Sequence, residues 1–203
     1  MTTNEVLLIH GTTAIPNPAK RHWPDKFKTY LHGVFGTTPK VLEWSGAVSV
    51  EARSLAAHNV FNFAAELHST NPKTHLILIG YSHGGNIAIE AINKLAANAA
   101  FPVNEAITLI TIATPIRPRY QLNTRVRQHI NAYNRLDFMQ IFGQFGTGTR
   151  LYDVGVRSFN GAKNEVAKRY IGHRSMHSNE MFWATHILES LTFDKGNEGA
   201  INV

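Results

Sequence analysis

The stretch from residue 76 to residue 95 constrains the fold more than any other part of the sequence. Residues 76–79 read Leu-Ile-Leu-Ile, an apolar run that is typical of a buried strand. Residues 80–84 read Gly-Tyr-Ser-His-Gly, and residues 86–95 have the composition of a helix. A strand, a tight glycine turn and a helix in this order form the context of a nucleophile elbow, which raises a serine above the edge of a sheet. We therefore predict that Ser82 is a nucleophile; the alternative is that it only caps the helix.

Strand and helix patterns alternate along the rest of the chain. We expect further strands over residues 6–10, 40–44, 106–113, 130–134 and 151–156, and helices over residues 25–34, 51–68 and 178–191, the last one capped by Ser178. Alternation of this kind builds βαβ units. The sequence therefore predicts an α/β fold with a doubly wound, mostly parallel sheet of about six strands and helices on both faces.

The chain is expected to form a single domain over residues 1–203, since no linker, repeat or low-complexity tract interrupts it. A small lid or mobile loop is expected at about residues 138–150, where Phe142 and Phe145 stand among three glycines. These two phenylalanines either form an apolar lip that meets lipid or belong to a floppy loop with one ring in the core.

A nucleophilic serine needs a base to remove its proton and a carboxylate to orient that base. In a parallel sheet such groups belong on loops at the carboxyl ends of strands. Asp137 follows the expected strand 130–134 and is our candidate carboxylate, whereas its rival Asp153 lies within an expected strand. The base is His173 or His177, and we favour His173 because it lies farther from the helix cap, in a loop that can reach the serine.

The loop after the first expected strand reads His-Gly-Thr at residues 10–12. Backbone N–H groups in such a loop can stabilise the negative charge that develops on a substrate carbonyl oxygen. We predict that the oxyanion hole is formed by the N–H of Thr12 and by the N–H of His83, the residue directly after the serine.

Taken together, these motifs resemble those of a lipase or esterase of the α/β-hydrolase superfamily, over nearly the whole chain. The chain order of serine, aspartate and histidine is the order of that fold. The resemblance also rests on Trp-Ser-Gly at residues 44–46, on Arg53 in the next helix, and on Gly-His at residues 172–173. We expect Arg53 to brace the loop after the second strand. Two departures are expected: the first two strands of the full fold and a large cap domain are both missing.

The resemblance implies one role for each matched residue. These are Ser82 as nucleophile, Asp137 as acid, His173 as base, and Thr12 and His83 as oxyanion donors. The implied activity is hydrolysis of carboxylic esters through an acyl-enzyme, which needs no metal or organic cofactor. An acyltransferase with the same triad, or a binding protein that kept the fold without turnover, remains as an alternative.

Composition excludes several other classes of function. The chain has no cysteine, so it has no thiolate nucleophile, disulfide or cysteine zinc site. A metal-dependent hydrolase is disfavoured because the eleven histidines include no His-Glu-x-x-His or similar ligand spacing. The net charge of +6 favours anionic partners, but the basic residues are spread out, so no nucleic-acid binding is expected. The expected partner is an ester or lipid substrate, with weak contact to an anionic lipid surface.

The N-terminus lacks the basic and apolar segments of a signal peptide, and no apolar run approaches the ~20 residues of a membrane-spanning helix. We therefore expect a cytoplasmic protein, although export by a signal-independent route stays open. The oligomeric state and the acyl chain length of the substrate are left undetermined by the sequence.

Overall fold

The computed structural model describes residues 3–12, 23–98, 101–137, 157–168 and 171–191. Within these residues, six strands form one sheet in the order β2-β1-β3-β4-β5-β6, and every neighbouring pair is parallel. The strands are β1 Thr3–Ile9, β2 Lys40–Val41, β3 Thr74–Tyr81, β4 Ile107–Ile112, β5 Gln128–Tyr133 and β6 Lys163–Val166. The predicted doubly wound, parallel α/β sheet is thus confirmed.

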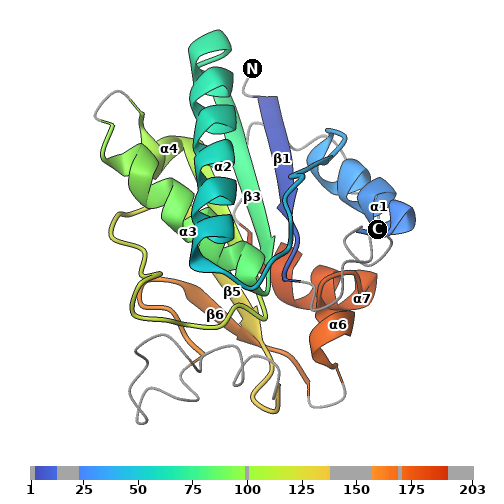
Figure 1. Cartoon of the computed structure of the whole chain (residues 1–203). Helices are drawn as coiled ribbons and strands as arrows, with labels where there is room; N and C mark the ends of the chain where they lie inside the picture. The colour runs from blue at the N-terminus through green and yellow to red at the C-terminus, as the bar shows by residue number, and fades with distance from the viewer. Residues whose placement is uncertain (1–2, 13–22, 99–100, 138–156, 169–170, 192–203) are drawn as a thin grey trace.

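Helices cover both faces of this sheet (Figure 1). The helices are α1 Asp25–Phe35, α2 Val50–Thr70, α3 His83–Ala96, α4 Val103–Ala106, α6 His173–Met176 and α7 Glu180–Phe182. A π-helical turn, Trp183–Ile187, and a 3-10 turn, Leu188–Ser190, continue α7. None of the described helices has both the length and the apolar composition needed to cross a bilayer.

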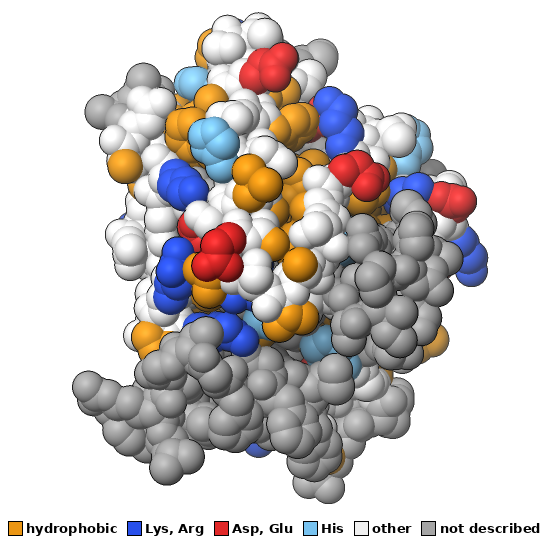
Figure 2. All heavy atoms as spheres, in the orientation of Figure 1, with side chains coloured by type: hydrophobic (Ala, Val, Ile, Leu, Met, Phe, Trp, Pro, Cys, Tyr) orange, Lys and Arg blue, Asp and Glu red, His pale blue; other side chains and the backbone are white. Residues whose placement is uncertain are grey.

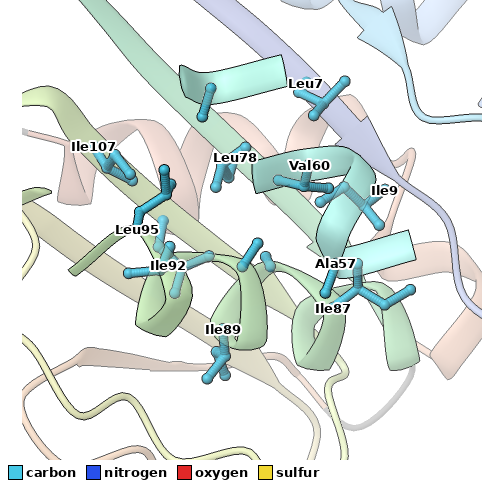
Figure 3. Packing of buried hydrophobic residues seen from close by; sticks show 14 of the residues in the cluster. Leu7, Ile9, Ala57, Val60, Leu78, Ile87, Ile89, Ile92, Leu95 and Ile107 are labelled. Carbon is cyan, nitrogen blue, oxygen red and sulfur yellow. The ribbon is translucent and has the colours of Figure 1, made fainter. Parts of the chain in front are cut away.

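Strand β1 shows why both faces must be covered, because its successive side chains enter two different cores. Leu7 and Ile9 belong to the cluster under α2 and α3, whereas Val6 and Leu8 belong to the cluster under α1 and the C-terminal helices. Successive side chains of a strand point to opposite faces of its sheet, so an unbroken apolar strand is buried on both sides. Figure 3 shows the first of these layers, with side chains from α2, α3 and the sheet gathered together.

Local signals set the helix ends around this core. The hydroxyl of Ser49 accepts a hydrogen bond from the Ala52 N–H and begins α2, as an N-cap does. Gly36 ends α1 with a left-handed φ of 72°, a conformation that costs glycine little. Figure 2 shows that, on the face covered by α2, basic and acidic side chains are interspersed over the described surface.

Three predicted elements differ from the structure or fall outside it. The second strand is only β2, shorter than the predicted range 40–44. The predicted strand 151–156, the lid at about 138–150 and Asp153 all lie outside the described residues. The strand that pairs with β5 is β6, whose Lys-Asn-Glu-Val sequence carries no apolar run and was not predicted.

The cap of the last helix was also predicted wrongly. Asn179, and not Ser178, is the N-cap of α7, since the Asn179 Oδ1 accepts a hydrogen bond from the Phe182 N–H at 2.9 Å. Ser178 is one residue too early because it still belongs to the turn that follows α6, where its N–H donates to Ser175 O. The short helix α6 was not predicted either.

Candidate active site

The turn between β3 and α3 holds Ser82 in a strained backbone conformation. Its φ is 52° and its ψ is −128°, which is unusual for a residue that carries a Cβ. Two hydrogen bonds keep it there: the Ser82 N–H donates to Ile112 O at 2.8 Å, and the Gly85 N–H donates to Ser82 O at 3.0 Å. Such strain between a strand and a helix is the geometry of a nucleophile elbow. The side chain itself is half-buried, so one side of it faces outward.

Glycines bring neighbouring backbones unusually close to this elbow. A Cβ placed on Gly84 would lie 2.1 Å from the carbonyl oxygen of Ile9, at the end of β1. A Cβ on Gly11 would lie 2.7 Å from the Ser82 Cβ and 3.3 Å from its Oγ. Real Cβ atoms do not approach other atoms so closely, so both positions require glycine. The loop after β1 therefore runs directly against the serine.

Asp137 and His173, which are 36 residues apart in sequence, are in direct contact. The Oδ2 atom of Asp137 lies 2.5 Å from the Nδ1 atom of His173. The aspartate side chain is only 1% exposed and the histidine side chain 14%. Because a carboxylate can only accept a hydrogen bond, the Nδ1–H of His173 donates to it, and Nε2 is left for another partner. This is the orientation that a carboxylate imposes on a general base.

A network of buried side chains holds the two segments that carry this pair. The Asn134 amide donates to Ile171 O at 2.7 Å and to Lys168 O at 3.1 Å, and its Oδ1 accepts from the Leu136 N–H. Asn134 thus ties the end of β5 to the chain just before His173. We did not predict this role, although the residue stands only three positions before Asp137.

Arg157 holds the aspartate segment from the other side. Its Nη1 donates to Asn134 O at 2.6 Å and to Asp137 O at 3.0 Å. Burial lowers the pKa of this guanidinium, and the negative charge of Asp137 partly offsets that change. We did not predict this role of Arg157, because nothing in its local sequence indicates which carbonyl groups its side chain will contact.

The ring of Tyr81, the residue before the serine, packs against both candidate bases. Its centroid lies 5.1 Å from that of His173 and 4.7 Å from that of His177. The ring of His177 also packs on Trp23, at 5.1 Å between centroids. Of the two histidines, His173 contacts the aspartate. The prediction that it lies in a loop is wrong, because it is the first residue of α6. Among the described residues, Ser82 Oγ and His173 make no hydrogen bond with each other.

The imidazole of His83 is kept neutral by its surroundings. Burial lowers the pKa of His83 to about 3, and the charges of Arg117, Arg53 and His173 act in the same direction. Its Nδ1 lies 3.1 Å from the Nδ2 of Asn86, which is a donor, so Nδ1 accepts. The His83 N–H belongs to the first residue of α3, where backbone N–H groups have no partner within the helix.

Arg53 has a different partner from the one predicted. Its Nε donates to the hydroxyl of Tyr120 at 2.9 Å, and the guanidinium lies 5.7 Å from the centre of that ring. The contact joins α2 to the segment after β4, so the prediction that Arg53 braces the loop after β2 is wrong. A cation over an aromatic ring is favourable, which accounts for this choice of partner.

Within the described ranges, no three His, Asp or Glu side chains gather in a way that would hold a metal ion.

Comparison with known proteins relates this geometry to a fold. A scan against protein-family models finds no match, and a search of curated proteins finds none either. Among solved structures, a dienelactone hydrolase from Anabaena variabilis has a TM-score of 0.52 at 12% identity, covering 91% of this chain and 87% of that one. An alpha-beta serine hydrolase homologue from Coxiella burnetii has a TM-score of 0.51 at 13% identity, covering 88% and 80%.

A lipase-esterase related protein from Clostridium acetobutylicum matches over a shorter span. Its TM-score is 0.37 at 19% identity, and the match covers 56% of this chain but only 43% of the other. Together with the all-parallel sheet and the strained elbow, the solved structures show that this chain has an α/β-hydrolase-like fold.

Proposed function

We propose that this protein is a serine hydrolase that cleaves carboxylic esters through an acyl-enzyme. The observation that carries the proposal is the 2.5 Å contact between His173 Nδ1 and Asp137 Oδ2. Ser82 follows the carboxyl end of β3 and Asp137 follows the carboxyl end of β5, and the carboxyl ends of parallel strands meet at one edge of a sheet. The contact with Asp137 brings His173, from a segment far away in sequence, to that edge. A histidine oriented by a buried carboxylate is the base that a serine hydroxyl needs in order to react.

In the first half of the reaction, Ser82 Oγ attacks the carbonyl carbon of the ester while His173 Nε2 removes its proton. Asp137 stabilises the imidazolium ion that forms. The negative charge on the carbonyl oxygen is accepted by the N–H groups of Thr12 and His83. When the tetrahedral intermediate collapses, the alcohol leaves with the proton of the imidazolium, and the acyl group stays on the serine.

In the second half, water takes the place of the alcohol. His173 removes a proton from that water as its oxygen attacks the acyl carbon, and it returns the proton to Ser82 Oγ when the acid is released. The start of α3 favours both steps, because the partial positive charge at a helix N-terminus stabilises a nearby oxyanion. A dienelactone hydrolase shares the fold, which agrees with ester chemistry at this site.

A fluorophosphonate probe tests the proposal directly, because it reacts with activated serines only. We expect it to label Ser82, and we expect Ser82→Ala to abolish both labelling and hydrolysis of p-nitrophenyl butyrate. Ser69→Ala is the matched control, since Ser69 is exposed and its hydroxyl donates to Glu66 O within the same helix. Full turnover by a purified Ser82→Ala variant would overturn the proposal.

A panel of esters then defines the substrate. We propose an ester or lipid substrate, and comparing short dispersed esters with micellar and anionic phospholipid substrates distinguishes an esterase from a lipase. Adding an alcohol acceptor to the same assay identifies an acyltransferase, because the acyl group would then pass to the alcohol in preference to water.

A further inference from the structure

Trp44, in the segment after β2, holds the backbone of the loop after β1. Its indole N–H donates to His10 O at 3.1 Å, and its ring stacks on the His10 imidazole with centroids 5.1 Å apart and planes 20° apart. Both side chains are buried. The other two tryptophans, Trp23 and Trp183, are buried as well, but their indole nitrogens have no hydrogen-bond partner among the described residues. Among the described residues, Trp44 is thus the one tryptophan whose indole N–H makes a hydrogen bond.

His10 passes this constraint to the next peptide group. Its Nδ1 lies 2.7 Å from Gly11 O, and because a carbonyl oxygen only accepts, the Nδ1–H donates. A peptide group is planar and almost always trans, so fixing its C=O also fixes the direction of the N–H on the other side. Fixing His10 O therefore orients the Gly11 N–H, and fixing Gly11 O orients the Thr12 N–H. The same loop lies against Ser82, as the close approach of Gly11 shows.

We propose that Trp44 is a positioning residue that orients the oxyanion hole through His10. This inference rests on the proposed serine hydrolase function. By holding the His10 carbonyl and its imidazole, the indole fixes the peptide groups on either side of Gly11 and so keeps the N–H of Thr12 directed at the carbonyl oxygen of an ester bound at Ser82. Trp44 thereby acquires a role that the sequence alone did not explain.

Such a role predicts a particular kinetic signature. The oxyanion exists only in the transition state, so loss of its orientation lowers kcat and leaves KM nearly unchanged. Trp44→Phe removes the indole N–H and keeps an aromatic ring for stacking. We expect its kcat on p-nitrophenyl butyrate to fall roughly tenfold, because a misplacement of about 1 Å can cost about 100-fold and the phenylalanine ring keeps part of the packing on His10. His10→Phe, which removes the bond to Gly11 O, is expected to give a similar loss of kcat.

Trp183→Phe is the matched control, because it removes another buried indole, which packs on Phe27 and whose N–H has no hydrogen-bond partner among the described residues. We expect Trp44→Phe and Trp183→Phe to lower the melting temperature to a similar extent, while only Trp44→Phe loses kcat. Equal kcat in the two variants, or a rise in KM with kcat unchanged, would overturn the inference. If Trp44→Phe does not fold, His10→Phe carries the same test.

Ser82→Ala in the same series separates the two proposals. An inactive Ser82→Ala together with a fully active Trp44→Phe would refute the positioning role alone. A fully active Ser82→Ala would refute the serine mechanism, whatever the tryptophan variants do.

Discussion

Replacing Asp137 by asparagine tests the contact on which the proposed mechanism depends. Asparagine has the same shape, but its amide can present an N–H to His173 Nδ1, which then has to accept. The histidine proton moves to Nε2, so the nitrogen facing the serine can no longer remove a proton. Because the aspartate side chain is 1% exposed and the histidine 14%, water has little access to replace the lost charge.

The expected loss follows from this burial. In serine proteases the same substitution lowers kcat about 10⁴-fold. For a pair buried to this degree we expect a loss of about 10³- to 10⁴-fold, which corresponds to about 4–5.5 kcal/mol of activation free energy. The fold should persist, because Arg157 holds the segment through the carbonyl oxygens of Asn134 and Asp137 and not through the carboxylate.

Two measurements check this expectation. Steady-state kcat on p-nitrophenyl butyrate gives the size of the loss, and urea unfolding shows that Asp137→Asn is folded. Asp25→Asn is the control, since Asp25 has an exposed side chain on the surface of α1. A folded Asp137→Asn variant with a kcat within tenfold of the unsubstituted protein would refute the assignment of Asp137 as the orienting carboxylate.

Two further predictions concern the packing and the pH dependence of the fold. In urea unfolding, Gly84→Ala should destabilise the protein by several kcal/mol, because the new Cβ would lie 2.1 Å from a backbone oxygen. Gly33→Ala is the control: it lies in open space on α1 and should stabilise the protein by up to about 1 kcal/mol. A Gly84→Ala protein as stable as Gly33→Ala would contradict the close approach. Burial lowers the pKa of His129 from 6.5 to about 4. At a pH between these two values, His129 therefore binds a proton in the unfolded chain but not in the folded protein. The free energy of unfolding should therefore decrease as pH falls from 6.5 to 4, by about 3 kcal/mol from this residue. His129→Gln should reduce this dependence of the unfolding free energy on pH, whereas His58→Gln, at an exposed position, should not. The same pH dependence in both variants would contradict the assignment to His129.

Elements set by local sequence patterns were predicted more completely than those set by contacts with distant segments. Strand β3, helix α3 and the turn between them were predicted because apolar periodicity and glycine spacing act within a few residues. Strand β6 was not predicted because it is an edge strand with a polar sequence. Backbone pairing with β5 holds it in the sheet, and its side chains give no sign of that pairing. The cap of α7 was misplaced by one residue because both Ser178 and Asn179 can cap a helix, and the turn after α6 uses the first of them.

The sequence by itself determined the parallel α/β sheet, the position of the elbow and the residue types available for catalysis, because these depend on patterns that neighbouring residues create. Only the tertiary structure decided which of those residues meet. Asp137 reaches His173, Asn134 reaches Ile171, and Trp44 reaches His10 across long separations in the chain. The order of the strands in the sheet sets these contacts, and strand order is a property of the whole packed core that no single segment encodes.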